Sequence, residues 1–220
     1  MMCDERETIA FLCDFDGTVC PTQMMDFLYG HFAACGMEFA ERWQRGEIST
    51  QEEIESTFAT VRASREEMEA ALDTIEIDPH FPAFLEFCRS RDDAFAIVSD
   101  GLEWYIDYIL TKHDIRGVDI YANRIHFGAG GFRFEFPWYD DETPMRGVCK
   151  PRIVRRYQER GRKVIYAGDG MSDFDVVGVA DHIFARRKLA SFTRVQGVEF
   201  TEFNDCRDLL DKWRSLSSVG

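Results

Sequence analysis

The sequence has far fewer basic than acidic residues. Its 220 residues include 26 lysines and arginines against 40 aspartates and glutamates, so the formal net charge is -14. Proteins that bind nucleic acid need clusters of lysine and arginine to contact the phosphate backbone. This shortage argues against a nucleic-acid partner, and an anionic substrate would need local donors or a bound cation.

The sequence also lacks paired cysteines. Its seven cysteines are odd in number and scattered, and no two of them form a Cys-x-x-Cys pair. Cysteines at such short spacing are typical of zinc sites and of redox-active dithiols. We therefore interpret the cysteines as reduced thiols of a cytosolic protein rather than as a disulfide framework.

Long hydrophobic runs are absent as well. No segment approaches the about 18 uninterrupted apolar residues that a membrane-spanning helix requires. The N-terminal stretch MMCDERETIAFLCDFD carries acidic side chains where a signal peptide would need a basic region. These features predict a cytoplasmic protein without a membrane partner.

Short apolar segments alternate with segments of helical periodicity. This alternation predicts the α/β class, with a Rossmann-like parallel sheet flanked by helices. The predicted strands are residues 8–13, 94–101, 163–167 and 182–185, with a β-hairpin at 125–136. The predicted helices outside the central segment begin at Asp78-Pro79, after the second strand, at Lys150-Pro151, after GDGMSD and at about residue 204.

A central segment of the chain differs from this pattern, because helical periodicity continues through it without a strand. Ser49 with Glu52, and Ser64 with Glu67, match the helix-start signature of a hydroxyl followed three residues later by a carboxylate. We expect this segment to form an inserted helical domain. The predicted domains are a core of residues 1–20 and 78–220 and a helical cap of residues 21–77.

Polar side chains follow three of the predicted strands. Asp14 and Asp16 come after the first strand and Ser99 lies at the end of the second. Asp169 and Asp173 follow a later strand. Because open parallel sheets bind ligands beyond the C-terminal ends of their strands, we expect these side chains to face one crevice.

Two carboxylates directly after a buried strand are costly unless a metal, a partner or a reaction uses them. A carboxylate can attack phosphorus and form an acyl phosphate, provided that a cation such as Mg²⁺ neutralises the anionic target. Asp14 and Asp169 can each offer Mg²⁺ a carboxylate, and Asp16 its main-chain carbonyl oxygen. The Asp16 side chain is then left to protonate the leaving oxygen and to activate water.

Further residues offer contacts to a phosphoryl group. Lys150 can supply a positive charge, and Ser99 and Thr18 can supply hydroxyls. Asp100 and Gly101, which follow Ser99 directly, complete the candidate phosphate-binding residues. We assign no role to the histidines, which show no ligand spacing.

These segments resemble a known family. DFDGT at 14–18, Ser99 in IVSDG, Lys150 and GDGMSD at 168–173 are similar to the four ordered motifs of the haloacid dehalogenase superfamily phosphatases. The motifs are spread through the core strands, so the resemblance covers nearly the whole chain. The helical segment between the first two motifs looks like the C1-type cap of subfamily IB.

The resemblance implies a role for each motif residue. Asp14 would be the nucleophile and Asp16 the acid and base, while Ser99 and Lys150 would bind the phosphate. The Mg²⁺ site would comprise Asp14, Asp16 and Asp169, and Asp173 would hold the metal or its waters.

The substrate is less well defined by the motifs. Phosphoserine phosphatases carry a glutamate and a cap arginine where this chain has Gln23 and Thr57, although Arg62 or Arg65 could substitute. A tryptophan-containing loop before CKP, the stretch FARRKLA and a late Phe/Asp cluster are similar to 2-hydroxy-3-keto-5-methylthiopentenyl-1-phosphate phosphatases of methionine salvage. The resemblance therefore implies a phosphatase of a small phosphorylated metabolite, with that intermediate as the leading substrate.

Other functions remain open at this point. A phosphoserine phosphatase-like enzyme and a phosphotransferase share the same motifs. A receiver domain of a signalling protein would place its acidic pair and its phospho-accepting aspartate on different strands, without a helical insertion. A catalytically silent binding protein would be expected to lose Asp14 or Asp16, and neither is lost. Asp100 replaces a glycine found in many relatives, and the oligomeric state is not predicted.

Overall fold

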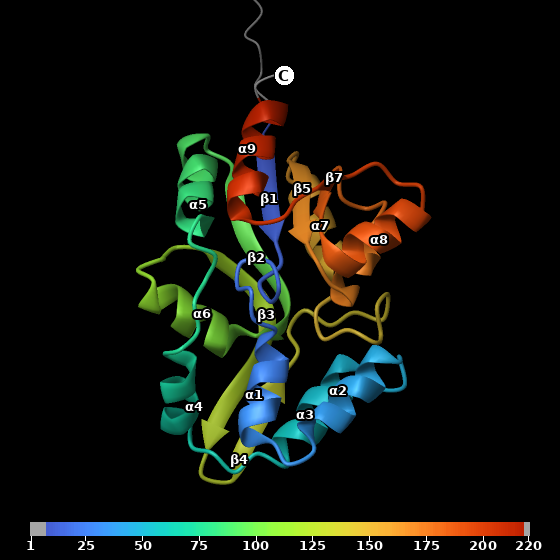
Figure 1. Ribbon diagram of the computed structural model, residues 1–220. Coiled ribbons are helices and arrows are strands. Elements are labelled where there is room, and N and C mark those ends of the chain that lie inside the picture. The colour runs from blue at the N-terminus through green and yellow to red at the C-terminus, as the bar shows by residue number, and fades with distance from the viewer. Residues whose placement is uncertain (1–7, 218–220) are drawn as a thin grey trace, which may run out of the picture.

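The computed structural model describes residues 8–217 and consists of a sheet with helices on both faces and a group of helices at one end (Figure 1). The strands are β1 (Ile9–Cys13), β2 (Ala94–Leu102), β3 (Asp119–Gly128), β4 (Gly131–Glu135), β5 (Lys163–Gly168), β6 (His182–Ala185) and β7 (Thr201–Glu202). They form one sheet in the order β4-β3-β2-β1-β5-β6-β7. The pairs are parallel except for the β3–β4 hairpin, which confirms the predicted α/β class.

The helices fall into two groups. Four of them lie in the predicted insertion, namely α1 (Met24–Phe32), α2 (Gly36–Gln44), α3 (Thr50–Phe58) and α4 (Arg65–Leu72). The others are α5 (Phe81–Ser90), α6 (Glu103–Lys112), α7 (Lys150–Gln158), α8 (Arg187–Val195) and α9 (Cys206–Ser217), with a 3-10 helix η1 at Met171–Val176. Within residues 8–217, no helix has the length and apolar character that crossing a membrane requires.

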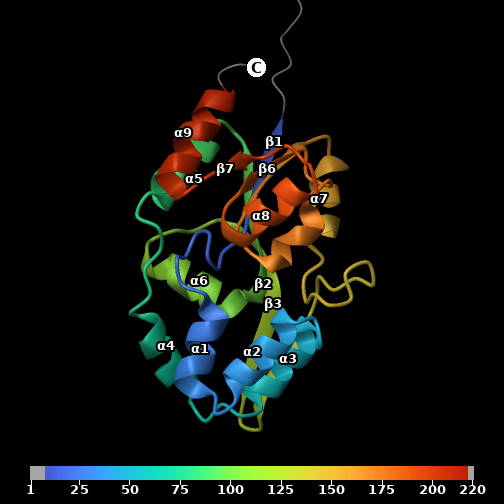
Figure 2. The ribbon, with the colours of Figure 1, turned by 45° about the vertical axis from the view of Figure 1, so that its right-hand side comes forward.

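Strand β1 is buried on both faces, as its continuous apolar sequence predicts. Phe11 faces α5 and α9, where its ring contacts Phe84 at 4.8 Å and Trp213 at 5.7 Å. Leu12, on the opposite face, shares a hydrophobic cluster with Ile153 and Val154 of α7. Figure 2 shows α5 with α9 and α7 with α8 on opposite sides of the sheet. The central strand therefore joins two hydrophobic layers.

The two helix-start signatures predicted in the insertion are present in the structure. Ser49 and Ser64 are the N-caps of α3 and α4, and each forms a capping box with the glutamate three residues later. The two hydroxyls and two carboxylates satisfy backbone donors that would otherwise lack partners at the start of each helix. These boundaries therefore follow directly from the sequence.

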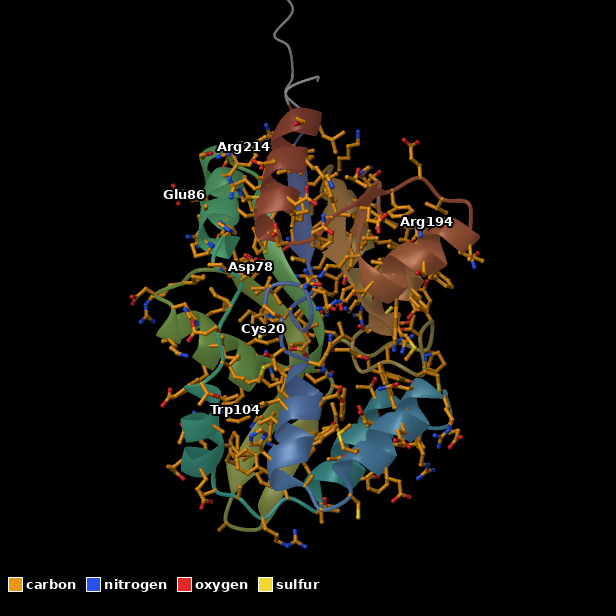
Figure 3. All side chains as sticks on the ribbon, in the orientation of Figure 1. Cys20, Asp78, Glu86, Trp104, Arg194 and Arg214 are labelled. Atoms are coloured by element: carbon orange, nitrogen blue, oxygen red, sulfur yellow. The ribbon has the colours of Figure 1, made fainter. Side chains whose placement is uncertain are left out.

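The predicted start of α5, with Asp78 as N-cap, is wrong by two residues. The helix begins at Phe81 after the N-cap residue His80, and its first turn contains Pro82. The Asp78 carboxylate accepts hydrogen bonds from the backbone N–H groups of His80 (2.9 Å) and Cys206 (3.0 Å). In Figure 3, Asp78 lies near the ends of both α5 and α9. Asp78 thus links two helix starts instead of capping one.

Several elements differ in extent from their predicted ranges. The hairpin strand β3 begins at Asp119 rather than at residue 125, and α8 and β7 were not predicted. Strand β7 has two residues, too few to produce an alternating pattern. The expectations for the first seven residues, including the start of the core domain, the absence of a signal peptide and the state of Cys3, lie outside the described residues.

The insertion packs against the β3–β4 hairpin, which extends beside α1, α3 and α4 (Figure 1). The Phe58 ring of α3 contacts Phe132 at 5.3 Å and Phe134 at 5.1 Å, both in β4. A polar contact joins α6 to α4, where the Trp104 indole donates to Glu69 Oε1 at 2.9 Å (Figure 3). The β3–β4 hairpin, which lies outside the insertion, therefore forms part of the hydrophobic core of the insertion.

We predict that Phe58→Ala lowers the free energy of unfolding by about 3 to 5 kcal/mol, because a buried ring with aromatic neighbours leaves a cavity. Denaturant unfolding measures this loss. Met37→Ala, at an exposed residue of α2, is the control and should change stability by about 0.5 kcal/mol or less. Equal losses in the two variants would contradict the packing of α3 on the hairpin.

Candidate active site

A cavity of about 290 Å³ lies where the C-terminal ends of β1, β2 and β5 meet the helices of the insertion. The ends of these strands and the loops after them contribute the predicted site residues Asp14, Asp16, Ser99, Asp100, Gly101 and Asp169 to its wall. Thr18, Lys150 and Asp173 are buried and contact residues of this wall. The structure thus brings together residues from four distant segments of the chain.

Lys150 is buried among carboxylates at the first position of α7, where the following Pro151 suits the start of a helix. Its Nζ lies 3.2 Å from Asp14 Oδ1 and 2.6 Å from Asp173 Oδ1. Burial alone would lower the pKa of Lys150, but the charges of Asp14 and Asp173 raise the pKa above its ordinary value. The side chain therefore remains a fixed positive charge beside Asp14.

Hydrogen bonds that involve the backbone hold Asp14 in place. The N–H of Phe15 donates to Asp14 Oδ1 at 2.8 Å, and the N–H of Asp14 donates to the carbonyl of Ala167 in β5 at 2.8 Å. Burial and then the negative charge of Asp173 raise the pKa of Asp14 well above its usual range. The carboxylate is therefore destabilised by its surroundings unless a further cation lies beside it.

The acidic cluster fits a divalent cation. Asp14, Asp169 and Asp173 are all buried, and each offers one oxygen within 4.8 Å of those of the other two. Hard cations such as Mg²⁺ prefer oxygen ligands, and the two positive charges of Lys150 and Arg187 do not neutralise three buried carboxylates. The side chain of Asp16 lies outside this group, and the use of its main-chain carbonyl as a metal ligand stays a prediction.

The carboxylate of Asp173 accepts hydrogen bonds from several donors. Its Oδ1 accepts hydrogen bonds from Lys150 and from the Tyr166 hydroxyl, each at 2.6 Å. Its Oδ2 accepts hydrogen bonds from the backbone N–H groups of Asp169 and Gly170, each at 2.9 Å. With four donors around two oxygens, Asp173 is better suited to hold Lys150 and the following loop, and to contact metal-bound water, than to bind a metal directly.

Asp16 is placed by a residue that the sequence analysis missed. The Tyr105 hydroxyl, on α6, donates to Asp16 Oδ2 at 2.6 Å, while Oδ1 is buried without a partner among the described residues. Burial raises the pKa of Asp16 to about 7, although the hydrogen bond from Tyr105 opposes this shift. A Cβ at position 101 would collide with the Tyr105 hydroxyl, so Gly101 leaves the space for this contact. No sequence pattern indicated this contact, because Tyr105 lies within a helix of mainly apolar residues.

The turn after β1 requires a glycine. Gly17 adopts a φ of +73°, and a Cβ there would collide with the side chains of Asp169 and Gln23. The Thr18 hydroxyl donates to Asp169 Oδ1 at 3.4 Å, so the structure places Thr18 beside the acidic cluster. Its predicted contact with a phosphoryl group stays a prediction.

Two arginines after β6 also lie at this site, and their roles were not predicted. Arg186 donates hydrogen bonds to the carbonyls of Gly17 and Asn204, and Arg187 Nη1 lies 3.1 Å from Asp169 Oδ2. Arg187 and Lys188 line the cavity. Their position directly after a parallel strand was the available signal, because that strand ends at the same edge of the sheet as β1 and β5.

The structure gives the Asp100 side chain partners other than the expected phosphate. Its Oδ1 accepts hydrogen bonds from the backbone N–H groups of Gly147 (2.8 Å) and Val148 (2.9 Å). Its Oδ2 accepts one from the Thr50 hydroxyl of α3 at 2.6 Å. Asp100 therefore ties the loop before Lys150 to the insertion. Ser99, by contrast, accepts a hydrogen bond from the N–H of Gly101 and keeps its own proton for a ligand.

Thr50 is the centre of a polar contact between the insertion and the rest of the chain. Its N–H donates to the carbonyl of Met145 at 3.0 Å, and its hydroxyl accepts from the Trp43 indole at 3.0 Å. The Arg146 guanidinium lies 5.7 Å from the Trp43 ring centre and pairs with Asp175 at 2.9 Å. These contacts position the loop that precedes Lys150.

The arginines considered as substitutes for a cap arginine lie away from this cavity. Arg62 donates to the carbonyls of Ala59 and Val61. Arg65 pairs with Glu69 at 2.7 Å and lies over the Phe127 ring. The insertion instead contributes Gln23, Met25, Asp26, Ala40, Trp43, Gln44, Thr50 and Glu53 to the cavity wall. Within the described chain, this part of the wall carries carboxylates and no basic side chain.

Comparison with known proteins agrees with the resemblance seen in the motifs. The profile of the haloacid dehalogenase-like hydrolase family matches residues 11–177. A 2-hydroxy-3-keto-5-methylthiopentenyl-1-phosphate phosphatase of Exiguobacterium sibiricum is 30% identical, over 93% of this chain and 95% of its own length. A protein of the same name from Brevibacillus brevis is 29% identical, over 83% of this chain and 84% of its own.

Solved structures share the fold at lower identity. A phosphoserine phosphatase from T. onnurineus superposes with a TM-score of 0.69 and covers 96% of this chain and 97% of its own. Its sequence identity is 16%, so this likeness concerns the fold. The parallel sheet with its helical insertion is therefore an arrangement known from phosphatases.

We predict that Asp100→Ala lowers the free energy of unfolding by about 2 kcal/mol or more, because the N–H groups of Gly147 and Val148 lose their acceptor. Denaturant unfolding measures the loss, and Asp107→Ala, at an exposed position of α6, is the control. If Asp100→Ala proved as stable as the control, the positioning role of Asp100 would be wrong.

Proposed function

Because this chain belongs to the haloacid dehalogenase-like hydrolase family, we propose that it is a Mg²⁺-dependent phosphatase of a small phosphorylated metabolite. One observation carries the proposal: Lys150 Nζ lies 3.2 Å from Asp14 Oδ1 at a cavity that Asp16, Ser99 and Asp169 also line. This combination supports the assignment of a nucleophile, a proton donor and phosphate-binding groups to residues around one space. A phosphotransferase would use the same groups, but no specific observation favours it.

The phosphoryl group of the substrate would be bound by Lys150 and by the Ser99 hydroxyl. The carboxylates of Asp14 and Asp169, with the main-chain carbonyl of Asp16, would hold Mg²⁺, while Asp173 supports the site. When bound, Mg²⁺ would offset the negative charge of the phosphate and so allow an anionic nucleophile to approach it. Lys150, 3.2 Å from Asp14 Oδ1, would contribute to the same effect.

Hydrolysis would proceed in two steps. In the first, a carboxylate oxygen of Asp14 attacks phosphorus, and the bond from phosphorus to the leaving oxygen breaks. Asp16 donates its proton to that oxygen, which leaves as an alcohol. The pKa of about 7 for Asp16 is compatible with this task, because an appreciable fraction of the carboxyl is protonated near neutral pH.

In the second step, water attacks the phosphorus of the acyl phosphate. Asp16 takes a proton from the water, the bond between phosphorus and the Asp14 oxygen breaks, and inorganic phosphate is released. Tyr105 keeps Asp16 oriented in both steps through its hydrogen bond to Oδ2. The initial protonation states of Asp14 and Asp16 are thereby restored.

The names of the relatives support 2-hydroxy-3-keto-5-methylthiopentenyl-1-phosphate as the substrate. The structural relative named as a phosphoserine phosphatase makes phosphoserine the second candidate. Phosphoserine has a carboxylate in its non-phosphate part, and an ionised Asp26 on the insertion side of the cavity would repel it. The methylthio compound has no carboxylate and fits a wall that also contains Met25 and Trp43.

The cytoplasmic location and the division into a core and a cap at residues 21–77 stay predictions. The packing of α3 on the β3–β4 hairpin, together with the Thr50–Asp100 contact, supports a cap that is closed over the cavity in this structure.

We expect the purified protein to release phosphate from 2-hydroxy-3-keto-5-methylthiopentenyl-1-phosphate when Mg²⁺ is present. Hydrolysis of phosphoserine should be slower by a factor of roughly ten or more. Removal of the metal with a chelator should abolish turnover, and added Mg²⁺ should restore it. Equal rates with and without chelator would count against a metal-dependent phosphatase. Faster hydrolysis of phosphoserine would reverse the order of the two substrates.

Asp14→Asn should reduce kcat by roughly a thousandfold or more, because the amide lacks the anionic oxygen that attacks phosphorus. Steady-state hydrolysis of p-nitrophenyl phosphate measures the effect. The thermal midpoint shows whether the variant is folded, and Asp107→Asn on α6 controls for the loss of one charge. Near-normal turnover by folded Asp14→Asn would place the nucleophile elsewhere.

A further inference from the structure

Glu53 is a buried carboxyl on the insertion side of the cavity, in the first turn of α3. It is 6% exposed and lines the same space as Asp14 and Ser99. Its position lies one helical turn after Thr50, which contacts Asp100. The side chain therefore faces the part of the cavity that the non-phosphate portion of a substrate would occupy.

The Glu53 carboxyl has no hydrogen-bond or ion-pair partner among residues 8–217, whereas the capping glutamates of α3 and α4 are bonded to backbone N–H groups. The side chain is largely buried while its oxygens open onto the cavity, so a bound ligand can hydrogen-bond them in place of water. Since Glu53 lines a cavity of about 290 Å³, the missing partner can come from a molecule in that cavity.

The charges around Glu53 indicate the state in which it would bind. Asp26 and Tyr29 face it from α1 and Asp100 from β2, while Arg187 and Lys188 line the same cavity from α8. Burial and the charges of Asp100 and Asp26 raise the pKa of Glu53 to about 8. At neutral pH the carboxyl is therefore mostly protonated, so it can both donate and accept a hydrogen bond.

We propose that Glu53 determines substrate specificity by hydrogen-bonding a neutral hydroxyl group on the non-phosphate part of the substrate. The inference rests on the proposed phosphatase function and narrows its substrate class. A neutral acid suits an uncharged hydroxyl, while Met25, Ala40 and Trp43 leave apolar wall for the remainder of the molecule. The methylthiopentenyl phosphate named for the relatives carries such a hydroxyl and an apolar methylthio end.

Three phosphomonoesters of equal chain length test the proposal, namely propyl phosphate, 2,3-dihydroxypropyl phosphate and 3-aminopropyl phosphate. The wild-type enzyme should hydrolyse the dihydroxypropyl ester with a kcat/KM about tenfold above that of the propyl ester, mainly through a lower KM. The aminopropyl ester should not be preferred over the dihydroxypropyl ester. A preference for the amine would mean that Glu53 acts as an ionised counter-ion, and it would overturn the proposal.

Two variants assign the preference to Glu53 itself. Glu53→Leu should reduce the ratio of kcat/KM for the dihydroxypropyl and propyl esters to about one, because leucine cannot hydrogen-bond the hydroxyl. Glu53→Gln should retain most of the ratio, since an amide is a neutral donor and acceptor of similar shape. Glu55→Gln, at an exposed position of the same helix, is the control and should leave the ratio and the overall activity unchanged. An unchanged ratio in Glu53→Leu would refute the role of Glu53.

The hydrolysis of p-nitrophenyl phosphate by the wild-type enzyme separates this inference from the proposed function. If that ester is not hydrolysed, the phosphatase proposal itself fails. If it is hydrolysed while the three alkyl esters are not, or while they react equally, the inference about Glu53 fails alone.

The thermal midpoint checks the fold of the variants and the protonation state of Glu53. Because the pKa of Glu53 in the folded protein lies above its ordinary value, its contribution to stability is present at low pH and lost as pH rises through about 8. Glu53→Gln cannot ionise and should therefore gain in midpoint relative to the wild type from about pH 5 to about pH 9. A constant difference over that range would contradict a neutral Glu53.

Discussion

The arrangement of the site depends on the burial of one ammonium group between two carboxylates. Lys150, Asp14 and Asp173 are all nearly inaccessible to water, and Lys150 Nζ contacts an oxygen of each aspartate. Removing such charges from water is costly, and loss of one partner leaves the others without compensation. The three segments that carry them, far apart in the sequence, must therefore meet in one geometry. The start of α7, the end of β1 and the helix η1 are fixed relative to each other by this requirement.

Most of the residues around this interaction could be predicted because the signals are local. A short apolar strand followed by Asp14, and another followed by Asp169, places two carboxylates at the same edge of a parallel sheet. The capping boxes at Ser49 and Ser64 are equally local, since each involves two residues within one helical turn. Such features depend on spacing along the chain and little on tertiary contacts.

The features that could not be predicted depend on contacts between distant residues. The Tyr105 hydroxyl reaches Asp16 across 89 positions of sequence, and Asp100 meets Gly147 across 47. Asp78 misled the prediction of the α5 start because its carboxylate also binds the N–H of Cys206, a partner that no local pattern reveals. The position of Glu53 at the cavity could not be predicted for a similar reason. A glutamate in a polar helix is expected to face solvent, and only the fold places this one at a cavity.

The cavity wall has two origins, and this has a consequence for how such an enzyme can diversify. Groups that would act on phosphorus come from strand ends and are bound to one another, so a change in any of them disturbs the rest. Residues such as Met25, Trp43 and Glu53 come from helices α1 to α3 and share no hydrogen bond with Asp14 or Lys150 among the described residues. Mutations on these helices can alter which molecule is accepted without changing the reaction. The same scaffold can therefore acquire new substrates by gene duplication and a few exchanges in one segment.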